Sequence, residues 1–262
     1  MKHITVLLAL TLTVGGLAGC TTNVQTGLPA EARPIGASPS AALPPKEALL
    51  AAVQTLDTTA HSFTIKQGTM TGNGRIDPAA KSALMGMGGK IENLTVSVAY
   101  TVIAPDFWVK ADFGKDLNQL WGLDPATWML FDRSKLDAAA TLPVDQAGAP
   151  KLGVTELFRN GLADVKRTDA THFTGTVDVT AADTILAPSE EAVKKAGAQA
   201  KALPFTATTD GKGRLTAFTI DGGSIDPDLA LQLTFTGFGS IQPVTEPTPA
   251  APAPASAYDL FN

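Results

Sequence analysis

Two segments with apolar residues at every second position occupy residues 94–102 and 107–113. The apolar members of the first segment are Leu94, Val96, Val98, Tyr100 and Val102. A Pro105-Asp106 turn signal separates the segments. A period of two places alternate side chains on opposite faces of a strand, so each segment is expected to bury one face. The pair therefore predicts an antiparallel hairpin within a sheet that has one apolar side.

The same periodicities predict the remaining elements. Further strands are expected from Phe63 to a turn at Gly72-Asn73-Gly74, and at 127–132, 172–180, 205–209, 214–220 and 229–236. Helical spacing of apolar residues predicts helices at 45–60, 153–162 and 189–203. Because the predicted strands follow one another in runs, their order indicates an α+β fold with one strongly curved antiparallel sheet and its helices gathered on one face.

A glycine- and methionine-rich stretch at 78–89 interrupts this pattern. Asp77-Pro78 has the residue types of a helix N-cap followed by proline at the first helical position, and Gly86 to Gly89 would stop such a helix. The sequence therefore predicts a short helical insert at 78–86. Met85 and Met87 in this insert are either an adaptable pocket wall or gap-filling core residues.

Residues 1–19 have the pattern of an export signal. Lys2 precedes an apolar stretch from Ile4 to Gly16 that is too short to span a bilayer. The following Leu17-Ala18-Gly19-Cys20 resembles a bacterial lipobox, and Cys20 is the only cysteine of the chain. We therefore expect lipidation of Cys20, cleavage before it, and a lipid-anchored location on the extracytoplasmic face of the cell membrane. The alternatives are a lone buried thiol, or an ordinary export signal with a cysteine nearby by chance.

Two proline- and alanine-rich segments border the predicted domain. The first, 20–44, is expected to be a flexible tether after the lipidated cysteine, and the second, 243–262, a flexible tail. The folded domain is thus predicted at 45–242. The chain carries 20 Lys and Arg against 25 Asp and Glu, for a net charge of −5, and this acidic balance argues against nucleic acid as a partner.

The sequence contains no recognisable catalytic or metal-binding motif. His61 and His172 lack zinc-ligand spacing, and no serine lies in a Gly-x-Ser-x-Gly elbow. We therefore expect no catalytic residues, no metal, no cofactor and no enzymatic activity. Trp108, Trp121 and Trp128 could form a ligand platform, although core packing is the more common role of such residues.

Several stretches resemble the LppX/LprG-type lipoproteins of mycobacteria and related actinobacteria, whose fold is similar to that of the lipoprotein carrier LolA. They are the lipobox with its proline-rich tether, the Pro45 to Ala60 helix leading into Phe63-Thr64-Ile65, and the stretches 128–136, 171–178 and 233–239. The resemblance implies a half-open β-barrel with helices on the concave face of the sheet, enclosing an apolar cavity for acyl chains. It also implies lipid or glycolipid transport across the envelope, membrane attachment through Cys20 and an envelope transporter as partner. A monomer is expected.

The apolar face of the central strand and the helices expected to cover it supply the candidate cavity residues. These are Leu49, Val53, Leu84, Met85, Leu94, Val96, Val98, Tyr100 and Val102. Two functions remain open at this point. The first is a lipid-binding lipoprotein with an open cavity, and the second is a non-enzymatic interaction or sensor module of the cell envelope whose cavity is closed by side chains.

Overall fold

The computed structural model describes residues 43–91, 93–136, 144–145, 147–151, 153–181 and 186–261. They belong to one compact unit of the chain. The predicted signal peptide, Cys20 and the tether lie outside the described residues, so these assignments remain predictions.

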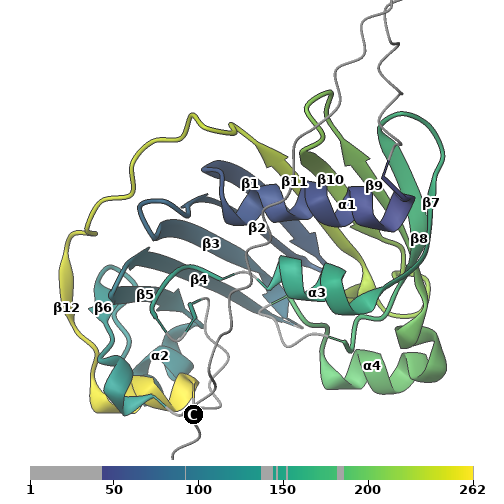
Figure 1. The fold of residues 1–262 in the computed structure, drawn as a ribbon. Coiled ribbons are helices and arrows are strands. Elements are labelled where there is room, and N and C mark those ends of the chain that lie inside the picture. Colours follow the sequence, from purple (N-terminus) through teal and green to yellow (C-terminus); the bar gives the residue numbers. More distant parts are fainter. Residues whose placement is uncertain are drawn as a thin grey trace, which may run out of the picture. The chain divides into compact units, whose positions relative to one another are not determined.

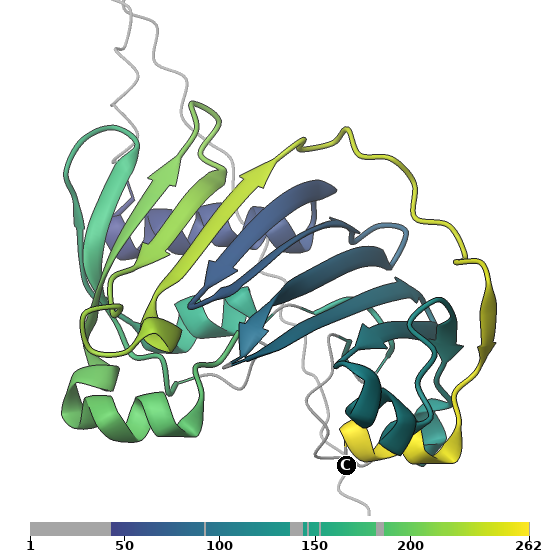
Figure 2. The same ribbon diagram turned by 180° about the vertical axis from the view of Figure 1, so that it is seen from behind.

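The described residues form a twelve-stranded sheet in the order β12-β6-β5-β4-β3-β2-β1-β11-β10-β9-β8-β7. The strands are β1 His61–Gln67, β2 Met70–Asp77, β3 Ser82–Ile91, β4 Leu94–Ile103, β5 Asp106–Asp112, β6 Trp128–Leu130, β7 Leu162–Arg167, β8 His172–Val177, β9 Leu203–Thr209, β10 Leu215–Ile220, β11 Leu231–Thr236 and β12 Ala250–Pro252. Neighbours pair antiparallel throughout, except that β12 runs parallel to β6. The sheet bends but does not close, because β12 and β7 are its two edges (Figures 1 and 2). The predicted α+β class with a large antiparallel sheet is confirmed.

Few helices accompany the sheet. The α-helices are α1 Pro45–Gln54, α2 Lys115–Trp121, α3 Val154–Gly161 and α4 Glu190–Ala196. Short 3₁₀ turns are η1 Thr55–Asp57, η2 Arg133–Lys135, η3 Gly197–Lys201, η4 Pro227–Leu229 and η5 Ala255–Leu260. In α1, proline at the first turn suits a position with no intrahelical N–H bond to make, and Leu49, Ala52 and Val53 form its buried stripe. Helices α1 and α3 contact each other and the strand β7 (Figure 1).

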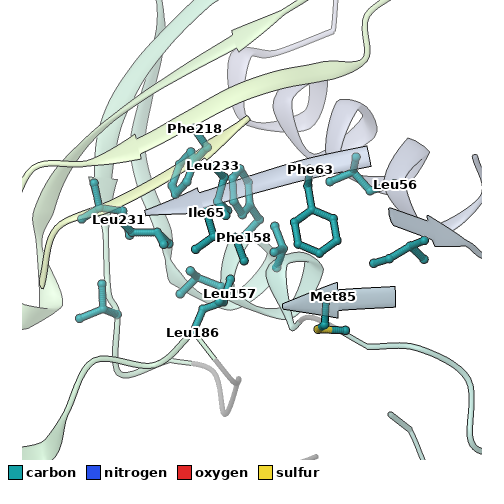
Figure 3. Packing of buried hydrophobic residues seen from close by; sticks show 14 of the residues in the cluster. Leu56, Phe63, Ile65, Met85, Leu157, Phe158, Leu186, Phe218, Leu231 and Leu233 are labelled. Atoms are coloured by element: carbon teal, nitrogen blue, oxygen red, sulfur yellow. The ribbon is translucent and has the colours of Figure 1, made fainter. Parts of the chain in front are cut away.

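The core lies between α1, α3 and one face of the sheet. Phe63 and Ile65 of β1 and Leu231 and Leu233 of β11 are buried there with Phe158 of α3 (Figure 3). The Phe158 ring lies 4.3 Å from that of Phe218 on β10 (centroid to centroid). At about 1.5–3 kcal/mol for each fully buried apolar side chain, this cluster is the main source of stability of the fold.

The predicted turn at Gly72-Asn73-Gly74 and the predicted helix at 78–86 are both wrong. Residues 70–77 form β2, 82–91 form β3, and Met70–Asp77 pairs with Ser82–Gly89. Glycine is needed at strand positions 72 and 74 because neighbouring atoms occupy the space where a Cβ atom would lie. A Cβ atom on Gly74 would lie 2.5 Å from Cζ of Phe63, and one on Gly72 would lie 2.6 Å from the Gly86 carbonyl oxygen. Close packing of neighbours is one of the uses of glycine inside a strand.

The folded domain does not end at 242. After β11 the chain crosses to the far edge of the sheet, where β12 pairs with β6 and η5 follows (Figure 1). Tyr258 is buried and its Oη accepts a hydrogen bond from the Asp132 N–H at 2.9 Å. Phe261 packs edge-on to Phe131 at 5.2 Å. The proline and alanine content suggested a free tail, but two aromatic side chains near its end anchor it to the sheet.

Other boundaries shift by a few residues. The predicted helix 189–203 is α4 followed by η3, since Gly197 leaves the helical conformation with φ of +55°. The predicted strand 229–236 begins at Leu231, because Leu229 lies in η4. Strand β7 and helix α2 were not predicted.

Candidate functional site

The apolar residues predicted for one face of the central strand lie on one face of β4, and they are Leu94, Val96, Val98, Tyr100 and Val102. Their side chains differ in how much of them is exposed to solvent. Val96 and Val102 are buried, Val98 and Tyr100 are half-buried, and Leu94 is 36% exposed. On the neighbouring strand, Met85 opposes Tyr100 and is buried. The predicted strand is confirmed, but burial follows the alternation only in part, because Leu94 of the apolar row is exposed and Thr101 of the opposite row is buried.

The other candidate residues belong elsewhere. Leu49 and Val53 are fully buried on α1 and belong to the packed core. Leu84 alternates with the buried Ala83 and Met85, so it lies on the opposite face of the sheet. The prediction that Leu84 faces the same cavity as Met85 is thus wrong, because the segment is a strand and successive residues point to opposite sides.

A half-buried apolar patch remains on the core face of the sheet. We define the inner patch as Met87, Val98, Tyr100, Phe113 and Trp121, which pack against the core but are not enclosed by it. The Phe113 and Trp121 rings meet edge to face at 5.5 Å, and Tyr100 stacks on Phe107 at 5.8 Å. Met87 was considered at the sequence level as pocket wall or core. Phe113 belongs to the predicted apolar row of 107–113, but neither Phe113 nor Trp121 was among the candidate cavity residues.

Tyr100 supplies the one phenolic group of the inner patch. Burial raises its pKa to about 12, because the ionised form loses solvation. The side chain is therefore uncharged at neutral pH, and the inner patch carries no formal charge.

A separate pocket of about 270 Å³ lies where η1, β1, β2 and the start of α3 meet. Apolar side chains that line it are Leu56, Ile76, Val154 and Phe235, and charged ones are Asp57, Lys81, Asp145 and Lys151. None of the predicted cavity residues lines this pocket. Its wall comes from segments far apart in the sequence, so no local pattern could have indicated it.

His61 lines the same pocket and is 2% exposed. Its Nδ1 lies 2.8 Å from the Thr59 carbonyl oxygen, which can only accept, so Nδ1 carries the hydrogen. Burial lowers the pKa of His61, although the Thr59 hydrogen bond and the nearby Asp57 act in the opposite direction. With Phe235 and Phe238 rings beside it, His61 acts as a neutral core residue.

The described residues contain no group of three or more His, Cys, Asp or Glu side chains arranged to hold a metal ion. Within the same part of the chain, no helix is both long and apolar enough to cross a membrane. The tryptophans divide between roles, since Trp108 is buried and Trp121 and Trp128 are half-buried.

No family model matches this chain, and no curated protein matches it significantly. The resemblance to LppX/LprG-type lipoproteins thus remains a prediction.

Proposed function

We propose that this chain is a membrane-anchored bacterial lipoprotein that binds the acyl chains of a lipid or glycolipid on the inner face of its sheet. The carrying observation is the inner patch, where large apolar side chains remain half-buried on a face that is otherwise packed. Apolar surface of this kind, grouped rather than scattered, is typical of a binding surface.

The architecture supports this proposal. An open, bent sheet with α1 and α3 on its concave face would be a half-open barrel, as in the LppX/LprG-type lipoproteins it resembles. Tyr100 is neutral and the other members of the inner patch are apolar, so the inner patch suits an alkyl chain, which needs no polar partner. Burial of each methylene group contributes about 0.8 kcal/mol.

The anchor rests on the sequence alone. A diacylated or triacylated Cys20 would hold the protein durably at the extracytoplasmic face of the membrane, because two or more chains are needed for stable attachment. An envelope transporter would then be the natural partner for a lipid cargo. The proposal assigns no enzymatic activity to the chain.

An interaction or sensor module with a closed cavity is the second candidate. It is favoured by the burial of Leu49, Val53, Met85, Val96 and Val102, each at most 4% exposed. In that case the inner patch would contact another protein rather than a lipid.

Lipid extraction decides between these two functions. The Cys20→Ser chain lacks the site of covalent lipid, so lipids that an organic solvent extracts from it are bound non-covalently. We expect mass spectrometry to find acyl lipids in this chain, and fewer of them in a Cys20→Ser/Val98→Trp chain. The matched control is a Cys20→Ser/Thr234→Trp chain, which puts the same ring at an exposed position of β11. Absence of lipid from all three chains would favour the interaction module.

Attachment is tested separately. Wild-type protein is expected in the detergent phase after phase partitioning, whereas Cys20→Ser is expected to be released or to remain uncleaved. A mature Cys20→Ser chain without lipid that partitions like wild type would contradict the predicted anchor.

A further inference from the structure

A groove of about 440 Å³ runs across the face of the sheet opposite the core. Its volume is within the range of about 300–1,000 Å³ found for small-molecule sites. Outward-pointing residues from β1 to β6 and β11 supply most of its wall: Ser62, Thr64, Asn73, Arg75, Leu84, Gly86, Ala99, Lys110, Trp128 and Thr236. We call it the outer groove.

The floor of the outer groove is set by strand register. Asn73 pairs with Gly86, Gly86 with Ala99, and Ala99 with Lys110. With about 4.8 Å between neighbouring strands, the Asn73 and Lys110 backbones are roughly 14 Å apart. The two residues between them carry at most a methyl group, so the row forms a trough with a polar side chain at each end.

Gly86 is not required by internal packing. Added Cβ atoms on Gly72 or Gly74 would clash with neighbouring chain, whereas one on Gly86 would meet only Ala99 Cβ at 3.8 Å and the Val98 carbonyl oxygen at 3.9 Å. Glycine inside a strand costs stability and often marks close approach of a ligand or another backbone. The open space beside Gly86 lies on the outer face of the sheet. Internal packing does not explain this glycine, and a ligand bound on the outer face would explain it.

The outer groove is positively charged on an acidic protein. Arg75 and Lys110 line it, and no Asp or Glu is among its lining residues. Neither cation takes part in the ion pairs found between described residues. The Lys110 Nζ instead lies over the Trp128 ring, 5.0 Å from its centroid.

Arg75 also has an unsatisfied donor. Its Nε is buried without a hydrogen-bond partner, and its Nη2 donates only a long bond of 3.4 Å to the Pro243 carbonyl oxygen. A buried donor without a partner costs about 1–3 kcal/mol, so such groups in folded proteins usually meet a ligand, ion or water.

We propose that the outer groove binds a small anionic ligand rich in hydroxyl groups, such as a sugar phosphate or a sugar acid. Arg75 holds the phosphate or carboxylate at one end of the trough. Lys110 at the other end, the Asn73 amide and the Ser62, Thr64 and Thr236 hydroxyls bond the sugar hydroxyls. The ring carbons lie over Gly86 and Ala99, beside Trp128. This site is on the opposite face from the proposed acyl-chain surface and is independent of it.

Isothermal titration calorimetry of the full chain in detergent tests the site with four probes: a glucose phosphate monoester, glucuronate, glucose and inorganic phosphate. We expect binding of the glucose phosphate, of glucuronate or of both, weakened by added salt because the site is exposed to solvent. The stronger of these two identifies the anionic group. Glucose should not bind, and inorganic phosphate should bind more weakly than its sugar ester. Failure of both anionic sugars overturns the proposal, as does inorganic phosphate binding as tightly as the ester.

Three variants locate the binding. Arg75→Gln and Lys110→Gln should each weaken affinity about tenfold, the effect of losing one charge-assisted hydrogen bond. Lys66→Gln is the matched control, because it removes one positive charge from an exposed residue of β1 that does not line the groove. It should leave affinity unchanged, and equal losses in Lys66→Gln and Lys110→Gln would contradict the assignment.

Gly86→Val is a second, independent test, because its Cβ has only ordinary contacts and its side chain would occupy the trough. Thermal unfolding should show unchanged or higher stability, since a β-branched residue suits a half-buried strand position with open space beside it, while the sugar no longer binds. Full affinity in a folded Gly86→Val chain would overturn the outer groove as the binding site.

Discussion

The two halves of the sheet are packed to different degrees. In the half formed by β8–β11 and β1, the core-facing Phe63, Phe173, Phe205, Phe218 and Leu233 are all buried. In the half formed by β3–β5, some core-facing residues are buried, such as Val96 and Phe107. Others are only half-buried, namely Met87, Val98 and Tyr100. The first half thus supplies most of the packed core, and the second retains half-buried apolar surface.

The largest expected effect comes from the fully packed half. Phe218→Ala removes a buried ring that packs on Phe158 at 4.3 Å, and we expect it to lower the free energy of unfolding by about 3–5 kcal/mol. Met87→Ala in the inner patch should cost only about 1 kcal/mol, because its side chain buries less area. Urea denaturation measures both, and equal losses would remove the distinction between the two halves.

Overpacking should separate neighbours on one strand. Val96→Trp adds a ring at a site that is 4% exposed and should destabilise the fold by about 1–3 kcal/mol. Val98→Trp changes a half-buried residue that pairs with Met87, and it should leave the melting temperature nearly unchanged while displacing bound lipid. A large stability loss in Val98→Trp would mean that the inner patch is closed.

Paired glycine variants extend the comparison to the two faces of the sheet. Gly74→Ala would bring a methyl group 2.5 Å from Phe63 Cζ and 2.7 Å from the Leu84 carbonyl oxygen, so we expect a loss of about 1–3 kcal/mol. Gly86→Ala should be neutral or should stabilise by roughly 0.5 kcal/mol, as alanine costs less than glycine in a strand. Thermal unfolding under identical conditions provides the measurement, and the reverse order would contradict the assigned faces.

The smallest expected effect is the part of the pH dependence that arises at the β9–β10 turn of the packed half. Hydrogen bonds from the Arg214 side chain and from the backbone N–H groups of Arg214 and Lys212 lower the pKa of Asp210 from 3.8 to about 2. The unfolded chain then takes up this proton first, so the stabilisation is present above about pH 4 and is lost as the pH falls toward 2. Asp210→Asn should flatten the stability profile in that window, and an unchanged profile in acid titrations would show that the β9–β10 turn does not depend on this carboxylate.

Sequence patterns by themselves determined the elements in which periodicity is strong. Alternation identified β4 and β5, helical spacing identified α1 and α3, and the strand patterns at 205–209 and 214–220 identified β9 and β10. In these segments local preference and the tertiary environment favour the same conformation, so short-range information was sufficient. The lipid anchor at Cys20 also rests on a local pattern and stays a prediction.

Only the tertiary structure decided the rest. Residues 82–91 have helix-stopping glycines but form a strand, and Gly72 and Gly74 of β2 leave room for Met87 and Met85 of that strand beside them. The C-terminal segment joins the fold because β12 pairs with the edge of β6 and the Phe261 ring packs against the Phe131 ring. Periodicity assigns a residue to one face of a strand. It does not determine how much of Val98 is covered, or that Arg75 and Lys110 line one groove, because both depend on chain segments that are distant in sequence.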